Sequence, residues 1–206
     1  GKPTFIGGLS RVNLAEGPRR ALLPEAVRTG IPPLEQTTDE KENPFWEILV
    51  PAIAGLAAPV AQIAAEKLGV PRAGAISVLD VGGGSGIYAV VWGRLNPQCR
   101  FTQLDWGNVN RIARDFTAKA GMGDRFETID DDFLAAAKKF IKAAHDAGEP
   151  FFVWFNTTHM HAFTHVKPES RGQAGRWQSE YHDVMIDHDK CIGEMLDFID
   201  KLGIAD

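Results

Sequence analysis

The sequence predicts an α/β fold around a doubly wound, mostly parallel sheet, and three observations carry this prediction. Short apolar runs alternate with amphipathic stretches from about residue 75 to residue 155, as in strand–helix–strand units with right-handed crossovers. The first run, 75–81, leads directly into a glycine-rich turn at 82–86, and Asp105 ends the second run. A strand, a glycine turn, a helix and a second strand ending in an acid are typical of a nucleotide-binding half-sheet.

The region before the first strand predicts helices joined by irregular chain. Residues 1–18 are rich in Gly and Pro and are expected to be irregular, and a short helix is expected at 18–28. Residues 30–43 are expected to form a loop. Pro44 suits the first turn of a helix that runs toward Gly69 with a kink at Pro51 or Pro59. Its apolar stretch, 48–65, is broken by prolines, Gly55 and Gln62, which favours a buried helix over a membrane span.

From residue 75 onward, strands and helices alternate. Strands are expected at 75–81, 100–105, 125–129 and 151–155, and helices at 86–95, 107–120, 131–147 and 179–202, with a long polar loop at 156–180. The run 151–155 is apolar throughout, which suits a strand covered on both faces. In the last helix, apolar residues at steps of three and four predict a stripe that faces the core: Tyr181, Met185, His188, Ile192, Met195, Ile199 and Leu202.

The glycine turn also indicates what kind of ligand it binds. Gly82, Gly84 and Gly86 let the backbone approach a ligand closely, and the helix that follows points its free N–H groups at the same crevice. Asp80 precedes the turn, and a carboxylate there repels a pyrophosphate but suits a cation. S-adenosylmethionine carries an ammonium and a sulfonium and no phosphate, so the pattern favours it over NAD. The carboxylate of Asp105 can accept both ribose hydroxyls.

Residues 43–133 resemble the cofactor-binding core of class I S-adenosylmethionine-dependent O-methyltransferases of the small-molecule type. The matching segments are Phe45-Trp46-Glu47, the run from Val78 to Gly86, Leu104-Asp105-Trp106, the run from Gly123 to Ile129, and Asp132-Phe133. Asp131 stands where that family usually has Gly. Residues 4–42 resemble the linker that leads into this core, and the dimerisation domain of the family is not part of the sequence.

The resemblance implies a set of cofactor-binding residues. It places the glycine loop under the methionine moiety, the Asp105 carboxylate on the ribose, and the Asp-Phe pair near the adenine. We therefore expect the S-adenosylmethionine site to include Asp80, Gly82, Gly84, Gly86, Asp105, Trp106, Asp132 and Phe133.

From about residue 130 the chain instead resembles the arylsulfatase family. The matching segments are the run from Pro150 to His161, the run from Thr164 to Gly172, Tyr181-His182-Asp183, and the run from Ile186 to Lys190. That resemblance implies that the strand at 151–155 ends at an active site and that His161 contacts a sulfate ester. The family's Cys-x-Pro-x-Arg segment and its calcium ligands have no counterpart, so sulfatase activity is not expected and no metal site is assigned.

The sequence therefore has the pattern of a chimera. Its expected parts are a lead-in at 1–43, a methyltransferase-like core at 44–130, and a sulfatase-like segment at 131–206 that completes the same sheet. The result is a Rossmann-like sheet in the order 3-2-1-4, with helices on both faces and a helical lead-in. The edge beside the fourth strand is a candidate surface for self-association.

Three histidines follow the fourth strand, at the carboxyl edge where ligands bind in such sheets. His161 and His159 are the candidate catalytic residues, as a general base that deprotonates the methyl acceptor. A metal site built from His159, His161 and His165 is an alternative, and a hydrogen-bonded remnant of the sulfatase pocket is another. His188, between two aspartates, is expected to be a buried, hydrogen-bonded residue and not a ligand.

Composition narrows the remaining functions. The net charge is −5, with no basic stripe, which argues against a nucleic-acid partner. No signal peptide is visible, and the two cysteines, Cys99 and Cys191, suit a reducing compartment, so a cytoplasmic protein is expected. Three hypotheses follow: a methyltransferase-like domain that transfers a methyl group from S-adenosylmethionine to a small molecule, a sulfatase fragment, or an inactive natural or engineered hybrid.

Overall fold

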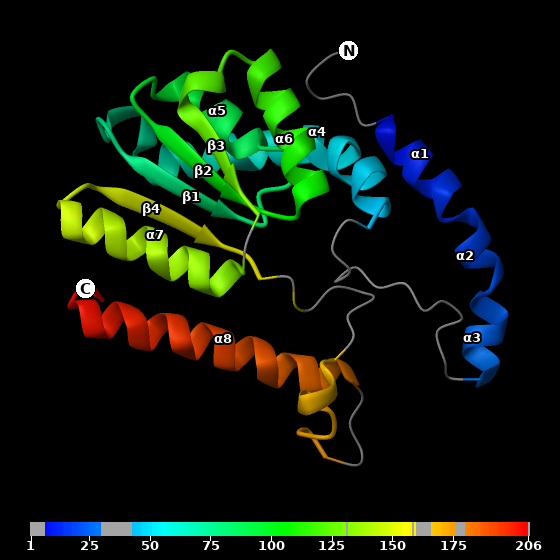
Figure 1. Cartoon of the computed structure of the whole chain (residues 1–206). Helices are drawn as coiled ribbons and strands as arrows, with labels where there is room; N and C mark the ends of the chain where they lie inside the picture. The colour runs from blue at the N-terminus through cyan, green and yellow to red at the C-terminus, as the bar shows by residue number, and fades with distance from the viewer. Residues whose placement is uncertain are drawn as a thin grey trace.

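The computed structural model describes residues 7–29, 43–130, 132–157, 159, 166–175 and 180–205. Its sheet contains β1 (Ser77–Val81), β2 (Arg100–Leu104), β3 (Phe126–Ile129) and β4 (Phe151–Phe155). The strands are parallel and lie in the order β3-β2-β1-β4 (Figure 1). This is the order predicted from the sequence, and the four strands lie where the apolar runs predicted them.

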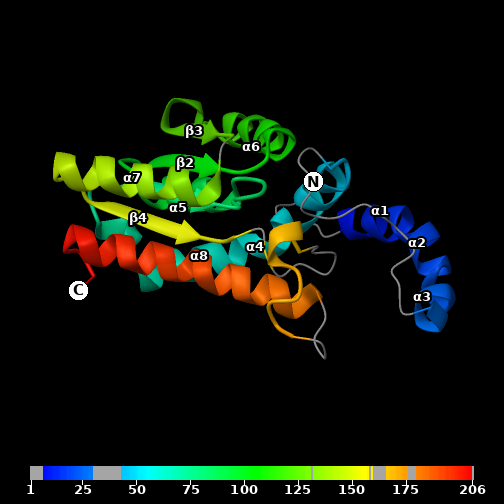
Figure 2. The same cartoon turned by 60° about the horizontal axis from the view of Figure 1, so that its bottom comes forward.

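Helices cover both faces of the sheet (Figures 1 and 2). One face carries α4 (Phe45–Lys67), α5 (Ile87–Leu95) and α6 (Gly107–Lys119), and the other carries α7 (Phe133–Ala147) and α8 (Glu180–Leu202). Three short 3₁₀ helices join these elements: η1 (Val70–Arg72), η2 (Gly123–Arg125) and η3 (Pro168–Ser170). The two-layered cover of a parallel sheet is the predicted doubly wound arrangement.

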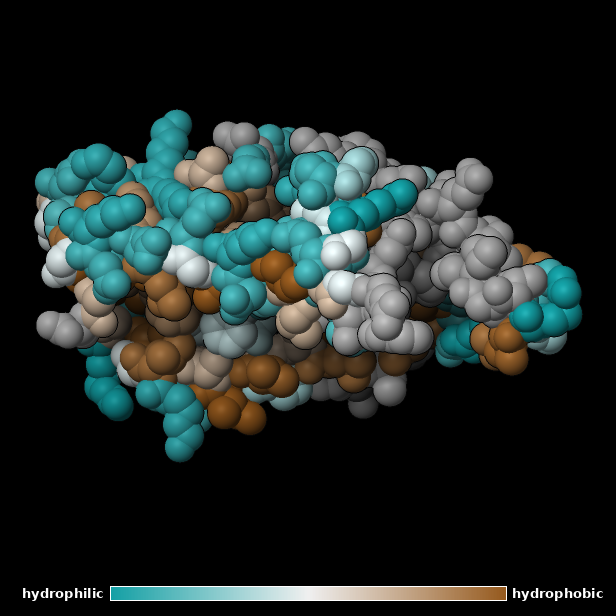
Figure 3. Space-filling model, turned by 90° about the horizontal axis from the view of Figure 1, so that it is seen from below, coloured by the Kyte–Doolittle hydropathy of each residue, from teal (hydrophilic) through white to brown (hydrophobic). Residues whose placement is uncertain are grey.

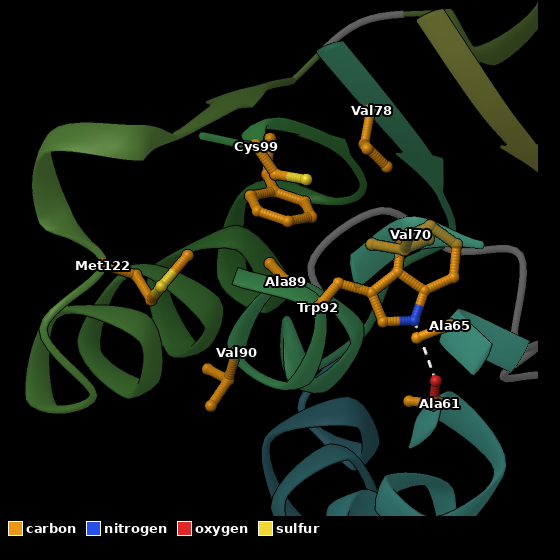
Figure 4. Close-up of a cluster of buried hydrophobic side chains, with 10 residues drawn as sticks. Ala61, Ala65, Val70, Val78, Ala89, Val90, Trp92, Cys99 and Met122 are labelled. Carbon is orange, nitrogen blue, oxygen red and sulfur yellow. Dashed lines mark hydrogen bonds between the residues drawn. The ribbon is translucent and has the colours of Figure 1, made fainter. Parts of the chain in front are cut away.

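Alternation along the strands divides the core into two clusters. Val78 and Phe101 point toward α4 and α5, and Leu79 points toward α7. The first cluster centres on Trp92, whose indole N–H donates a hydrogen bond to the Ala61 carbonyl at 2.8 Å (Figure 4). This bond fixes α5, the helix that follows the glycine loop, against α4.

The second cluster lies between the sheet, α7 and the carboxyl half of α8, and it corrects the expected stripe on the last helix. Met195, Ile199 and Leu202 pack into this cluster, but Tyr181 and Met185 are 48% and 47% exposed. Asp183 and Val184 are buried instead. The carboxylate of Asp183 accepts hydrogen bonds from the backbone N–H groups of the segment after η3, so a polar loop, not the sheet, covers the first turns of α8.

The amino-terminal region is more helical than predicted. The structure has α1 (Gly8–Ala15) within the part expected to be irregular, and α2 (Gly17–Ala21) and α3 (Leu23–Thr29) in place of one short helix. A Cβ on Gly8 would stand 2.9 Å from the Ala52 Cα, so glycine is what lets α1 approach α4 this closely. The prediction of irregular chain followed the Gly content and missed this packing role.

The helix α4 is only partly buried, which corrects the expectation of a buried helix. Its inner side packs against the first cluster, but large apolar side chains are exposed on the outer side: Ile53, Leu56, Val60 and Ile63. By length and composition alone, α4 is the one helix in the described part of the chain that could cross a membrane. Apolar residues form a broad band on the face seen from below (Figure 3).

Candidate cofactor site at the glycine loop

The loop between β1 and α5 depends on glycine for its shape. Gly82, Gly84 and Gly86 have φ values of +70°, +61° and +70°, in the left-handed region that L side chains rarely adopt. Gly86 is the residue that precedes α5, and its carbonyl accepts the first helical hydrogen bond, from Val90. The loop therefore brings bare backbone and the N–H groups of the first turn of α5 to the carboxyl edge of the sheet.

Asp105 faces this loop from the end of β2. Its Oδ2 atom accepts a hydrogen bond from the Gly84 N–H at 2.9 Å, and its Oδ1 atom accepts one from the Trp106 N–H at 2.8 Å. The residue is 7% exposed. Burial raises the pKa of Asp105 to about 6, against the two backbone hydrogen bonds that lower it, and the charge of Asp130 raises it further. Asp105 and the glycine loop are thus in direct contact.

Asp80 lies below the loop, next to Gln103 of β2. The two residues are paired in register, and both side chains are buried. Burial, followed by the charge of Asp105, raises the pKa of Asp80 to about 7. A Cβ on Gly83 would stand 2.7 Å from Gln103 Oε1 and 2.9 Å from Asp80 Oδ2, so the loop covers both groups without space to spare.

Sequence reasoning missed Gln103, Gly83 and Asn110. Gln103 lies within an apolar strand, where only its position two residues before Asp105 marks it. Its side chain is fully buried and donates hydrogen bonds to the Gly84 carbonyl and to Asn110 Oδ1. Asn110, also fully buried, lies in the first turns of α6 and donates to the Asp105 carbonyl.

Two aromatic rings lie beside Asp105. The rings of Trp106 and Phe133 have centroids 5.2 Å apart with planes inclined by 37°. This spacing leaves no room for a planar base between them, so a purine would stack on an outer face of the pair. Asp132, the other predicted residue here, caps α7, because its carboxylate accepts the Ala135 N–H at 2.8 Å. Asp131 lies outside the described residues.

The predicted catalytic histidines are only partly within the described residues. His161 and His165 lie outside them. The His159 ring lies 5.9 Å from that of His188 on α8, and His188 Nδ1 is hydrogen-bonded to Thr157 Oγ1 at 2.9 Å. Within the residues that the structure describes, no group of His, Cys, Asp and Glu side chains is arranged to hold a metal ion.

A cavity of about 380 Å³ lies away from the glycine loop. It opens toward the amino ends of β1 to β3, and its lining includes Ser77, Arg100, Asp124, Glu127 and Phe140. Glu127 accepts a hydrogen bond from Thr102 inside this lining. Ligands of doubly wound sheets bind at the carboxyl ends of the strands, so we place the candidate site at the loop and not in this cavity.

Comparison with known proteins links this geometry to methyltransferases. No family model matches the chain. A curated relative, 3-hydroxy-5-methyl-1-naphthoate 3-O-methyltransferase from Streptomyces sahachiroi, is 32% identical over 156 residues, which are 71% of this chain and 43% of the relative. The chain thus spans less than half the length of this relative.

Solved structures show the same fold. An O-methyltransferase family protein from Burkholderia thailandensis matches with a TM-score of 0.54 and 22% identity over 66% of this chain and 41% of its own. A proposed O-methyltransferase from Nostoc punctiforme matches with a TM-score of 0.52 and 22% identity over 64% of this chain and 39% of its own. The fold is therefore the Rossmann-like fold of methyltransferases. The resemblance of residues 130–206 to arylsulfatases receives no support from these comparisons.

Proposed function

We propose that this chain binds S-adenosylmethionine and that the reaction of its fold is O-methyl transfer to a small molecule. The observation that carries the proposal is the contact between the Asp105 carboxylate and the Gly84 backbone at the carboxyl edge of the sheet. This contact lies within residues 43–133, which resemble the methyltransferase core, and the S. sahachiroi relative is an O-methyltransferase of a hydroxynaphthoate. The chain's own acceptor is proposed only as a small molecule.

The residues at the loop fit this cofactor better than a nucleotide with phosphates. Asp80 Oδ2 is buried and has no hydrogen-bond partner among the described residues, and Asp105 lies next to it. A buried carboxyl group that lacks a hydrogen-bond donor gains more from a cationic group than from a pyrophosphate. The left-handed glycines at 82, 84 and 86 leave bare backbone along this loop.

Each predicted residue has a proposed role in this site. Asp105 holds the ribose, since each carboxylate oxygen that accepts one backbone N–H retains a lone pair for a hydroxyl. Gly82, Gly84 and Gly86 admit the methionine moiety. Trp106 and Phe133 offer an outer ring face to the adenine. Asp132 supports this end through its cap on α7 and not through a free carboxylate.

S-adenosylmethionine, when bound, supplies an electrophilic methyl group on a positively charged sulfur. The protein must hold the acceptor oxygen in line with that methyl group and, for a phenol or alcohol, accept its proton. We propose His159 or His161 as this base, because both follow β4 at the edge where the loop lies. His159 is half-buried and lies against the ring of His188.

Calorimetric titration with S-adenosylmethionine tests the proposal. Asp105→Ala removes the acceptor of the Gly84 N–H and of the ribose, so binding should weaken by about 10- to 100-fold. Asp115→Ala is the matched control, because Asp115 is an exposed acid on α6 outside the site. Equal affinities of wild type and Asp105→Ala would remove the ribose assignment, and no binding by the wild type would favour the inactive hybrid.

The other proposals concern assembly, compartment and the sulfatase hypothesis. We propose that self-association uses the open edge of β4, since β4 pairs only with β1 in the described sheet and its five residues include no charge and no proline. The free thiols of Cys99 and Cys191 support a cytoplasmic location. Sulfate-ester hydrolysis is not proposed, and an aryl sulfate should not be turned over.

A further inference from the structure

In the hydrogen-bond chain behind the glycine loop, the donor and acceptor of each bond can be assigned, starting from Asn110. The Asn110 side-chain nitrogen is surrounded by three acceptors: the carbonyls of Asp105 and Ile129 and the carboxylate of Asp130. This atom must therefore be the amide NH₂ group, and the other atom of the side chain is the oxygen. Asn110 Oδ1 can only accept, and it accepts from Gln103 at 3.1 Å.

The direction continues through Gln103. Its Nε2 atom donates to Asn110 Oδ1 and, at 3.0 Å, to the Gly84 carbonyl. Both protons of this amide are used, so the carbonyl oxygen Oε1 must face the remaining side, which is the side of Asp80. A flipped Gln103 would place its oxygen against two acceptors, and this excludes the other orientation.

Two acceptor atoms near Gly83 then remain without a hydrogen-bond donor. Gln103 Oε1 and Asp80 Oδ2 are both buried, and neither has a hydrogen-bond partner among the described residues. Both lie within 3 Å of one point beside the Gly83 Cα, at 2.7 and 2.9 Å. Buried polar atoms in folded proteins are nearly always hydrogen-bonded, and a proton on the Asp80 carboxyl group would supply the donor that these two acceptors lack.

We propose that Asp80 is protonated in the ligand-free protein and donates its proton to Gln103 Oε1, and that a cationic ligand binds with release of this proton. The release of the proton on ligand binding rests on the function proposed above, whereas the protonation of Asp80 in the free protein does not. Asp80 and Gln103 then act as a specificity device: they favour a ligand with a positive sulfur, S-adenosylmethionine, over its neutral thioether product, S-adenosylhomocysteine. This preference requires that Asp80 can lose its proton when the ligand binds.

The charges around Asp80 favour the protonated form. Asp105 of the β2 end and Tyr88 of α5 are the titratable groups that interact with it, and neither is a cation. Glu47 of α4 and Arg111 of α6 pair with each other at 2.7 Å, at the surface. The strand β4 carries no titratable group. Burial raises the pKa of Asp80 to about 7, in agreement with a proton held there.

Carbon-13 NMR of aspartate carboxyl groups tests the proton without any ligand. We expect a wild-type carboxyl resonance that titrates near pH 7 and is absent from Asp80→Asn. Asp105→Asn identifies the second carboxyl with a raised pKa. If the resonance of Asp80 titrates below pH 5, the carboxylate is charged in the free protein, and the proposal is overturned.

Calorimetry in buffers of different ionisation enthalpy tests the linkage. If only the ionised form binds S-adenosylmethionine, the dissociation constant should fall about tenfold from pH 6 to pH 8, with up to one proton released at pH 6. S-adenosylhomocysteine should show a smaller change.

Asp80→Asn provides the matched variant, because its amide N–H can donate to Gln103 Oε1 as the protonated acid does. Its binding should lose the pH dependence centred near pH 7, with similar affinities for the two ligands. A pH-dependent preference that survives in Asp80→Asn contradicts the proposal. Absence of S-adenosylmethionine binding at every pH contradicts the proposed function and the linkage, while the NMR result still decides the proton.

Discussion

Glycine-to-alanine substitutions can separate two free-energy costs, that of a left-handed backbone and that of crowding by the added Cβ. Gly83 does not have a positive φ, but an added Cβ would meet Gln103 Oε1 at 2.7 Å and the Asp80 carboxyl group at 2.9 Å. Gly121, outside the loop, has a φ of +79° and nothing within 4 Å of an added Cβ. Gly86 combines both, with a φ of +70° and Thr117 Cγ2 at 2.8 Å.

The expected magnitudes follow from these distances. A left-handed alanine costs about 1–2 kcal/mol, and a lower entropy of the unfolded chain offsets about 0.4–1 kcal/mol of this. Crowding in a packed interior costs about 1–3 kcal/mol. The free energy of unfolding should therefore fall by about 1 kcal/mol for Gly121→Ala, about 1–2 kcal/mol for Gly83→Ala and about 2–4 kcal/mol for Gly86→Ala.

Urea denaturation followed by tryptophan fluorescence measures these differences at one pH. Gly86→Ala and Gly121→Ala share nearly the same φ, so the excess cost of Gly86→Ala reports crowding alone. This excess should agree with the cost of Gly83→Ala within about 1 kcal/mol. If Gly86→Ala costs no more than Gly121→Ala, the close packing of the loop on β2 and α6 is wrong.

The remaining predictions concern pH, a helix cap and assembly. Because the folded-state pKa of Asp80 is raised to about 7, the folded protein binds more protons than the unfolded chain between about pH 4 and 7, and its free energy of unfolding falls as pH rises through this window. Between pH 5 and pH 8, Asp80→Asn should remove about 3 kcal/mol of this dependence at most. Urea denaturation at these two pH values checks it, and an unchanged difference would contradict the assignment. Asp132→Ala should lower the free energy of unfolding by about 1 kcal/mol through loss of the α7 cap, whereas Asp115→Ala should not, and equal values would exclude the cap. Val153→Pro should remove a backbone N–H group at the open edge of β4 and shift sedimentation toward the monomer. The Asn156 N–H donates to β1, so the N–H groups of odd-numbered residues in β4 point away from β1. An oligomer that persists in this variant would place the contact elsewhere.

The sequence could predict the sheet because its determinants are local. Each strand is a short apolar run, and the run of glycines at 82–86 marks a tight turn, in which Gly82, Gly84 and Gly86 have positive φ values. The order β3-β2-β1-β4 follows from the resemblance to the methyltransferase core, with the helix and strand at 131–155 in the place of its fourth strand. Right-handed crossovers then place α5 and α6 on one face and α7 on the other. Asp105 is predictable for the same reason, since it ends a strand.

The parts that could not be predicted depend on which surfaces meet. A period of three to four residues groups Tyr181 and Met185 with Met195 on one side of α8, but it does not say that the segment after η3 covers a different side at the amino end. Likewise, α1 forms where Gly8 approaches Ala52, a contact between distant positions. Gln103 resembles any polar residue in a strand until Asn110 fixes its orientation.

The structure also changes the electrostatic argument for the ligand. From the sequence alone, Asp80 is a fixed negative charge that selects a cation. In the structure this carboxylate is 8% exposed and lies next to a second acid, so its ionised form is unfavourable without a counter-charge. Protonation removes that cost in the free protein, so the loop does not carry a permanent negative charge at Asp80. Selection against a pyrophosphate then cannot rest on repulsion by Asp80 below pH 7. Asp105 does not exclude a phosphate either, because an acid at this position also accepts the ribose hydroxyls in dinucleotide-binding sheets. The preference for a cationic ligand therefore rests on the ionised form of Asp80, which a positive sulfur stabilises and a neutral thioether does not.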